Sequence, residues 1–256
     1  MHFQLTIVKV GGQVIEEPDS LKTLLEDFSR IAGYKMLIHG GGRTATELAK
    51  KLGVESKMVN GRRITDEETL KIATMVYAGL VNKQIVAKLQ SLLVDAVGLT
   101  GADMNIILSR KRPVTDIDYG FVGDVKEVNA RILSELLNQG YTPVLAPLTH
   151  DGEGNLLNTN ADTIASETAR ALAYDFNVRL IYCFEKKGVL LNENDENSVI
   201  PILDRELYQQ YKEAGTIKEG MIPKLDNAFR ALAAGVKEII ITSAAEMKTG
   251  KGTYIR

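Results

Sequence analysis

The chain has 256 residues, of which 45% are hydrophobic and 25% are charged, enough for a substantial core and one α/β domain. Its 31 Lys and Arg residues nearly balance its 33 Asp and Glu residues, and the formal net charge is −2. This balance excludes a global field that would attract nucleic acid or an anionic membrane, so any polyanionic ligand must be held by local charges.

The single cysteine and the first residues indicate a cytoplasmic protein. Cys183 lies in the apolar run VRLIYCFE, where we interpret it as a buried small hydrophobe, and one cysteine excludes an intramolecular disulfide. The start, MHFQLTIVKVGG, lacks the basic region and cleavage site of a signal peptide. No apolar stretch approaches the roughly 20 residues of a membrane span.

Apolar runs of strand length alternate with helical patterns along most of the chain. This rhythm predicts βα units, an α/β fold class and a mostly parallel sheet. Several runs are apolar at successive positions, as expected of strands that helices cover on both faces. The predicted strands cover residues 3–10, 35–39, 95–99, 142–148, 178–184 and 238–243.

Three stretches carry helical patterns: residues 19–32, 66–94 and 225–235, and the last ends at a predicted C′ glycine, Gly235. The helix over 66–94 is unusually long, which is compatible with a subunit interface or with a plain scaffold.

The helical periodicity fails between residues 101 and 125. There, short strands around the Arg112-Pro113 turn predict a β-hairpin flap. We interpret the basic run 110–112 as a solvated turn. No Ser/Pro linker, low-complexity tract or clear repeat interrupts the chain, so one domain with two lobes is the simplest partition.

Two glycine turns follow the first two predicted strands, Gly11-Gly12 and Gly40-Gly41-Gly42. The carboxyl edge of an open parallel sheet is where ligands bind, because loops diverge there and helix N-termini point inward. Glycines let backbone N–H groups approach an anion without a Cβ in the way. Either turn alone could simply reverse the chain, but the pair predicts a site for phosphate or carboxylate oxygens.

Charged and polar residues near these turns fit the same interpretation. Lys9 carries a charged ammonium group near the end of an apolar strand. There the charge needs an anionic or hydrogen-bonding partner unless the side chain reaches solvent. Three polar residues come directly before a helical run: Asn158, Asn160 and Asp162. A helix cap requires only one such side chain, so the others are available to a ligand. Lys224 follows Pro223 at the positive end of a predicted helix, where a nearby anion would stabilise it, unless it is an ordinary surface residue.

Other glycine-rich motifs do not match. The chain has no GxGxxG, and the tail TGKGTYIR lacks the first glycine and the Ser or Thr of a Walker motif. HGGG occurs without the GxSxG nucleophile elbow of esterases. With no HExxH and no CxxC pair, a dedicated zinc site is not expected.

Five ordered motifs together resemble the amino acid kinase family over nearly the whole chain. They are Lys9 with Gly11-Gly12, HGGG (39–42), NGRRIT (60–65), NTNAD (158–162) and EGMIPK (219–224). The resemblance implies a single domain over residues 1–256, a three-layer αβα sandwich around a mostly parallel open sheet with a β-hairpin flap. It also implies an N-terminal lobe for an acyl-amino acid, about 1–175, and a C-terminal ATP lobe, about 176–256.

The function that the resemblance implies is transfer of the γ-phosphoryl group of ATP to the side-chain carboxylate of an N-acyl-L-glutamate, in arginine biosynthesis. ATP and Mg²⁺ are the expected cofactors. Lys9 and Lys224 are the catalytic lysines that it implies, and Asp162 would hold both in position. Within the family, the acyl group is acetyl in some members and succinyl in others, and both remain open here.

The resemblance also assigns binding residues. Arg63 would clamp the α-carboxylate of the substrate, whereas its neighbour Arg62 is expected to be a plain surface residue. The full set of expected contacts is Gly41, Gly42, Arg63 and Asn158 for the substrate, and Gly11, Gly12, Glu185, Gly188, Thr216, Ile217 and Lys218 for ATP.

Three features depart from the family pattern. In the flap, Ala102 and Met104 occupy positions where similar enzymes tend to have lysine and glycine, so recognition of the acyl group is expected to differ. Similar enzymes place an aspartate near the nucleotide and metal where this chain has Glu185, followed by two lysines. The chain also has no helix before its first strand, the extension that arginine-inhibited hexamers of the family use. We therefore expect a homodimer without arginine feedback.

Alternative functions remain open at this point. The nearest are other members of the family, of the glutamate 5-kinase or carbamate kinase type. A non-catalytic regulator that binds nucleotide and amino acid is a different class, although a pure binder has no evident use for both Lys9 and Lys224.

Overall fold

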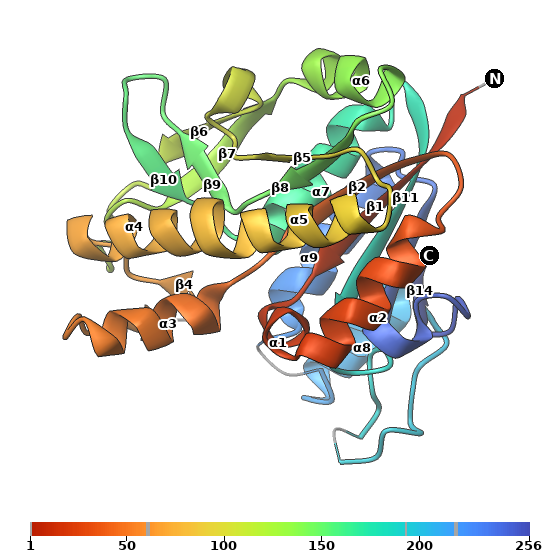
Figure 1. Ribbon diagram of the computed structural model, residues 1–256. Helices are drawn as coiled ribbons and strands as arrows, with labels where there is room; N and C mark the ends of the chain where they lie inside the picture. The colour runs from red at the N-terminus through yellow and green to blue at the C-terminus, as the bar shows by residue number, and fades with distance from the viewer. Residues whose placement is uncertain (1, 60–61, 193, 218–219) are drawn as a thin grey trace.

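The computed structural model describes residues 2–59, 62–192, 194–217 and 220–256. It has three layers, a central sheet with helices on both faces, as Figure 1 shows. The predicted α/β fold class and the three-layer sandwich are confirmed. No helix of these described ranges is long and apolar enough to cross a membrane.

The central sheet has eight strands in the order β12-β14-β13-β11-β1-β2-β8-β5. Its pairings are parallel except that β14 runs antiparallel to β13. The strands are β1 (Phe3–Val10), β2 (Tyr34–His39), β5 (Ala96–Leu99), β8 (Thr142–Leu145), β11 (Phe176–Phe184), β12 (Ile202–Leu203), β13 (Glu238–Ser243) and β14 (Thr253–Ile255).

Two smaller sheets extend this frame. One has four strands in the order β10-β9-β6-β7, and the other pairs β3 with β4. The predicted hairpin is present, because β6 and β7 pair antiparallel, but a loop over residues 112–122 joins them instead of a tight turn at Arg112-Pro113. The predicted strand 142–148 is instead divided at Ala146 and Pro147 between β8 and β9. The bounds are β3 (Met58–Val59), β4 (Arg62–Arg63), β6 (Ile107–Lys111), β7 (Gly123–Val128), β9 (Leu148–His150) and β10 (Leu156–Asn158).

The predicted long helix is built from α4, a π-helical turn η1, and α5, in continuous succession. Asp66 starts it, because its side chain accepts a hydrogen bond from Thr69 N at 2.8 Å. The helical elements are α1 (Gly12–Glu16), α2 (Pro18–Ser29), α3 (Gly42–Lys51), α4 (Glu67–Thr74), η1 (Met75–Val81), α5 (Asn82–Ser91), η2 (Asp103–Asn105), α6 (Ala130–Asn138), α7 (Ala161–Leu172), α8 (Arg205–Glu213), α9 (Ile222–Ala233) and η3 (Ala244–Glu246).

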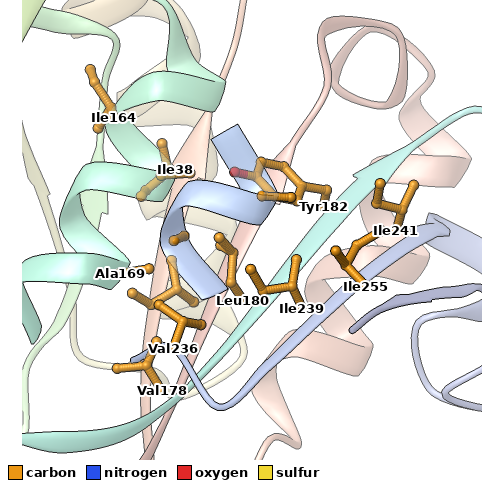
Figure 2. Close-up of a cluster of buried hydrophobic side chains, with 14 of the residues drawn as sticks. Ile38, Ile164, Ala169, Val178, Leu180, Tyr182, Val236, Ile239, Ile241 and Ile255 are labelled. Carbon is orange, nitrogen blue, oxygen red and sulfur yellow. The ribbon is translucent and has the colours of Figure 1, made fainter. Parts of the chain in front are cut away.

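Each face of the sheet buries its own hydrophobic cluster. Leu5 and Ile7 of β1 belong to the cluster packed with α6, α7 and α9, part of which Figure 2 shows. Val8 and Val10 belong to the cluster on the opposite face, packed with α2 and α5. Since side chains alternate along a strand, Lys9 shares the face of Leu5 and Ile7 and is directed toward the α7 layer.

Two local predictions are confirmed by the fold. Cys183 is fully buried on β11, and burial raises the pKa of its thiol to about 12, so it is an inert part of the core. Gly235 has a φ of +100°, the left-handed conformation of a C′ glycine after α9.

Candidate active site

The two glycine turns meet at the carboxyl ends of neighbouring strands. β1 lies between β2 and β11, and the N–H of Gly40 donates a hydrogen bond to Val10 O at 3.0 Å. A Cβ on Gly12 would lie 3.9 Å from the amide nitrogens of both Gly41 and Gly42. The backbone amides of both turns therefore gather in one small region free of side chains.

Lys9 and Asp162 form a buried ion pair beside these turns. The distance from Lys9 Nζ to Asp162 Oδ1 is 2.7 Å, and only 8% and 11% of the two side chains are exposed. Burial by itself raises the pKa of Asp162, but the charges of Lys9 and Lys224 and the hydrogen bond to Lys9 outweigh it and lower the pKa below its ordinary value. Asp162 is therefore an ionised carboxylate, paired with Lys9 and influenced by the charge of Lys224.

The start of α7 determines where Asp162 lies. The side-chain oxygen of Asn160 accepts hydrogen bonds from Asp162 N and Thr163 N, at 2.8 and 3.0 Å. Asn160 is thus an ordinary N-cap, and the helix that it starts presents Asp162 in its first turn. Asn158, two residues earlier on β10, donates from Nδ2 to Thr65 Oγ1 at 3.0 Å.

Arg63 is buried and points toward the second glycine turn. Its guanidinium donates to Ser56 Oγ at 2.8 Å, and to Gly42 O and Thr46 Oγ1, both at 2.7 Å. These bonds use three of the five guanidinium N–H groups. The guanidinium also lies beside Tyr77, because it lowers the pKa of that phenol against the larger effect of burial, and both side chains line a region that contains Gly42.

A buried polar network holds the backbone before the HGGG turn. His39 Nδ1 lies 2.7 Å from Gly40 O, and His39 Nε2 lies 3.0 Å from Asn82 Nδ2, which is also 2.9 Å from Val144 O. Burial, with a smaller contribution from Lys83, lowers the pKa of His39 to about 4 against the opposing bond to Gly40. His39 is therefore neutral, with Nδ1–H donating to Gly40 and Nε2 accepting from Asn82.

The π-helical turn contributes Tyr77 to the same region. A Cβ on Gly41 would lie 3.0 Å from Tyr77 Cδ1, and Gly41 has a φ of +146°. Both facts require glycine at this position. Tyr77 is a site residue that the sequence patterns did not indicate, since an apolar helix position ordinarily belongs to the core.

The glycine turns, the Lys9–Asp162 pair, Arg63 and Tyr77 line one pocket. Four cationic side chains and two carboxylates line it, for a net charge of +2 from these six groups. Of the residues expected from the sequence, the lining contains Lys9, Gly12, Gly41, Gly42, Arg63, Asn158 and Asp162.

Lys224 lies near enough to Asp162 and Lys9 for their charges to act on it. It lies in the first turn of α9, half-buried, with Nζ 4.4 Å from the centroid of the Phe184 ring. Burial lowers the pKa of Lys224, while Asp162 raises it and Lys9 lowers it further. Lys224 is not part of the pocket lining, but it shares the electrostatic environment of the Lys9–Asp162 pair.

Among the described residues expected at ATP, all except Gly12 lie outside the pocket lining. Gly11 donates its N–H to Cys183 O at 2.8 Å. Gly188 packs tightly, since a Cβ there would lie 2.7 Å from Thr253 Oγ1. Glu185 is exposed at the end of β11 and raises the pKa of Lys224. Ile217 is buried in the core beside the half-exposed Thr216, and Lys218 lies outside the described residues.

The structure corrects two predictions about arginines. Arg62 is exposed, as expected of a surface residue, but it lines the pocket. Arg112 was placed in a solvated turn, yet only 16% of its side chain is exposed, and it pairs with Asp124 within the pocket wall. A charge run is typical of a solvated turn. The pairing of β6 with β7 places Asp124 opposite Arg110, and only this pairing brings it within reach of the Arg112 side chain.

The chain is similar to known proteins over nearly its whole length. The family model described as "Amino acid kinase family" matches residues 4–243. A protein named acetylglutamate kinase from Parabacteroides distasonis is 64% identical over 98% of this chain and 99% of its own length. One with the same name from Methanopyrus kandleri is 38% identical over 98% of this chain and all of its own length.

Solved structures give the same fold. The structure of smu.665 from Streptococcus mutans is similar with a TM-score of 0.81 and 29% identity, over 98% of both chains. N-acetylglutamate synthase from Neisseria gonorrhoeae, complexed with coenzyme A and N-acetyl-glutamate, is similar with a TM-score of 0.84 and 23% identity, over 98% of this chain and 59% of that one. From the family model and the full-length relatives, the chain belongs to the amino acid kinase family.

Proposed function

We propose that the chain is a kinase that transfers the γ-phosphoryl group of ATP to the side-chain carboxylate of an N-acyl-L-glutamate, in arginine biosynthesis. The relatives named acetylglutamate kinase, at 60–64% identity over nearly their full length, support N-acetyl-L-glutamate as a substrate. They favour this reaction over those of glutamate 5-kinase or carbamate kinase, and over a non-catalytic regulator. The observation that carries the proposal is the buried Lys9–Asp162 pair beside two converging glycine turns.

The proposed reaction needs positioning and charge neutralisation. A carboxylate oxygen attacks the γ-phosphorus, the bond to the β-phosphate oxygen breaks, and ADP leaves with that electron pair. The nucleophile is already ionised, so no general base is required. Two like charges about 4 Å apart repel by about 4 kcal/mol at an effective dielectric near 20, and this repulsion is what the site must overcome.

Residues that line the pocket, together with Lys224 beside it, supply the required charges. In this proposal Lys9 and Lys224 contact the transferring phosphoryl group from two sides, and Asp162 is the positioning residue for both. The amides of Gly12, Gly41 and Gly42 donate to phosphoryl and carboxylate oxygens. Arg63 binds the α-carboxylate, and Asn158 contacts the same amino acid.

ATP is proposed to lie over Gly11, Glu185, Gly188 and the segment 216–218. The described residues contain no group of three or more His, Cys, Asp or Glu side chains that could hold a metal. This fits a Mg²⁺ ion carried mainly by the nucleotide phosphates, because Mg²⁺ usually takes only one or two protein carboxylates. Glu185 would be that carboxylate, and the ion would neutralise phosphate charge when bound.

The proposal includes a homodimer formed through the long helix. Met75 and Leu80 of η1 are 53% and 47% exposed, although they are apolar. A second copy of the chain packed against this turn would bury both.

The experiment that tests the function measures ADP release and traps the acyl phosphate with hydroxylamine. It is run with N-acetylglutamate, N-succinylglutamate, glutamate and carbamate. We expect acyl phosphate only from the N-acylglutamates. By analogy with the loss of one preorganised oxyanion donor, Lys9→Met should lower turnover by about 10²–10³.

Lys126→Met is the matched control, since this lysine is exposed on β7 and lies outside the pocket lining. Turnover of glutamate or carbamate alone would instead assign one of the other kinases. Binding of ATP and N-acetylglutamate without any turnover would assign the regulator.

A further inference from the structure

His39 lies buried behind the second glycine turn and has no role in the proposed reaction so far. It is the last residue of β2, its side chain is fully buried, and it does not line the pocket. The two glycines that follow it, Gly40 and Gly41, do line the pocket. A buried imidazole is costly unless its ring nitrogens are paired, so the partners of this ring show what it holds in place.

The hydrogen bonds of Asn82 decide which nitrogen of His39 carries the proton. Asn82 Nδ2 lies 3.0 Å from His39 Nε2 and 2.9 Å from Val144 O, and Asn82 Oδ1 accepts from Lys83 Nζ at 3.1 Å. The opposite amide orientation would place an oxygen against Val144 O and an NH₂ group against the Lys83 ammonium. Because Nδ2 can only donate, His39 Nε2 accepts and Nδ1 keeps the proton.

The Nδ1–H group of His39 fixes the peptide unit between Gly40 and Gly41. His39 Nδ1 lies 2.7 Å from Gly40 O. In a trans peptide, as here, the C=O and N–H groups point in opposite directions. Since Gly40 O is held toward the buried ring, the Gly41 N–H is directed to the pocket side. It donates to no acceptor within the described part of the chain, so it is available to a ligand oxygen.

The side chain of Asn82 occupies space that Gly98 leaves open. A Cβ on Gly98 would overlap Asn82 Oδ1 and would lie 2.7 Å from Lys83 Nζ. Lys83 Nζ also donates to Gly98 O at 2.9 Å. Asn82 is only 1% exposed, and it lies directly after the π-helical turn η1. The network therefore extends from β5 through the long helix to the glycine turn, behind the pocket wall.

We propose that His39 and Asn82 are positioning residues for phosphoryl transfer, which hold the Gly41 N–H toward the oxygen on which charge develops. This inference rests on the proposed function and adds two residues to it. Asn82 holds the imidazole, the imidazole holds Gly40 O, and the Gly41 amide is thereby a preorganised donor. Because such a donor acts on charge that develops during the reaction, its loss should lower kcat more than it changes KM.

The test compares kcat and KM for N-acetyl-L-glutamate in two variants of His39. His39→Asn keeps an N–H group near the position of Nδ1, so it can still donate to Gly40 O. His39→Gln keeps a polar atom near the position of Nε2 and loses that donor. We expect His39→Gln to lower kcat by about tenfold or more with a smaller change in KM, as for a misdirected oxyanion donor. His39→Asn should retain most of the kcat.

Lys35→Met is the matched control for stability. Lys35 lies near the other end of β2, outside the pocket lining, and its Nζ donates to Ser29 O and Ile31 O at 2.6 and 3.2 Å. Losing these bonds should lower the midpoint of urea unfolding. The kcat of the folded enzyme should remain that of the native chain, because the Gly41 amide is unaffected.

Gly98→Ala tests the network from its far end. This variant changes no residue of the pocket lining, but the added methyl group displaces the Asn82 amide from His39. We expect kcat to fall in the same direction as in His39→Gln, again with a smaller change in KM. An unchanged kcat in folded Gly98→Ala would remove Asn82 from the proposal.

Two kinetic outcomes would overturn the positioning role of His39. One is a native kcat in folded His39→Gln, and the other is an equal loss of kcat in His39→Asn and His39→Gln. If the native chain phosphorylates no N-acylglutamate, the proposed function fails, and the amide resonance of Gly41 in the ¹⁵N-labelled chain still decides the inference. It should shift when ATP is added to the native chain and to Lys35→Met, but not in His39→Gln. An equal shift in His39→Gln, or none in the native chain, would reject the inference.

Discussion

Lys9 and Asp162 are charged residues in the interior, and each is stable there because the other is present. Replacing a buried ion pair with packed apolar side chains is often neutral or stabilising, whereas removing one partner costs about 3–5 kcal/mol. Stability alone therefore gives little reason for a pair with Nζ and Oδ1 2.7 Å apart at this position. The proposed reaction does give a reason, because the transferring phosphoryl group needs a cation held in a fixed position.

His39 makes stability depend on pH. Its pKa is lowered from 6.5 to about 4, so the unfolded chain binds the proton more strongly than the folded chain does. The stability that neutral His39 contributes is complete above pH 6.5 and is lost as the pH falls toward 4. The difference corresponds to about 3 kcal/mol.

We expect urea unfolding to show this loss between pH 7 and pH 4 in the native chain and a smaller loss in His39→Gln. His150→Gln is the control, because His150 is only partly buried, with Nε2 2.8 Å from Asn105 Oδ1, and it should keep the full pH dependence. An unaltered pH dependence in His39→Gln would contradict this account.

At the scale of elements, the strands were the most predictable part of the fold. Residues 3–10 and 238–243 match β1 and β13 at both ends, because these runs are apolar and flanked by polar or glycine residues. The division of residues 142–148 into two strands was not predicted. The apolar run with Pro147 near its end predicts one continuous strand, and only the different partner strands of β8 and β9 show the division.

The N-cap residue of α7, Asn160, affects both the stability of this helix and the position of the site residue Asp162. Asn160→Ala removes the acceptor for Asp162 N and Thr163 N, and should lower the free energy of unfolding by about 1 kcal/mol. Because the same turn carries Asp162, we also expect turnover to fall. Asn160→Ser should restore both, since Ser is also a good cap.

Asp204→Ala gives the comparison for a cap outside the site. The Asp204 carboxylate accepts from Leu207 N at 2.8 Å and starts α8, outside the pocket lining. Its loss should cost a similar stability in denaturant unfolding with little change in turnover. Equal turnover losses in the two alanine variants would show that the cap of α7 has no special role in the site.

At the scale of the whole molecule, the sheet order brings distant segments together. β1 lies between β2 and β11, so motifs near residues 9, 40 and 162 reach one pocket although the chain between them is long. Met75 and Leu80 of the long helix are apolar and exposed. This exposure supports the proposed dimer, because a second copy of the chain would bury both side chains.

Substituting both residues tests that dimer. The native chain should behave as a dimer in light scattering after size exclusion, and Met75→Glu with Leu80→Glu should be a monomer, because charged residues are depleted in interface cores. Leu93→Glu, at a residue 95% exposed just after α5, should remain a dimer. A native chain that elutes as a monomer would reject the proposal.

The amino-acid sequence by itself determined the α/β class, most strands, the glycine turns and the family, because these depend on local periodicity, on backbone freedom and on motifs read in order. Tertiary structure alone decided that Arg112 is a buried wall residue paired with Asp124, and that Tyr77 and Arg62 line the pocket. The physical reason is that charge runs and apolar helix positions look alike whether they face solvent, core or ligand. Which of these a side chain meets depends on strand register and helix packing between residues far apart in the chain.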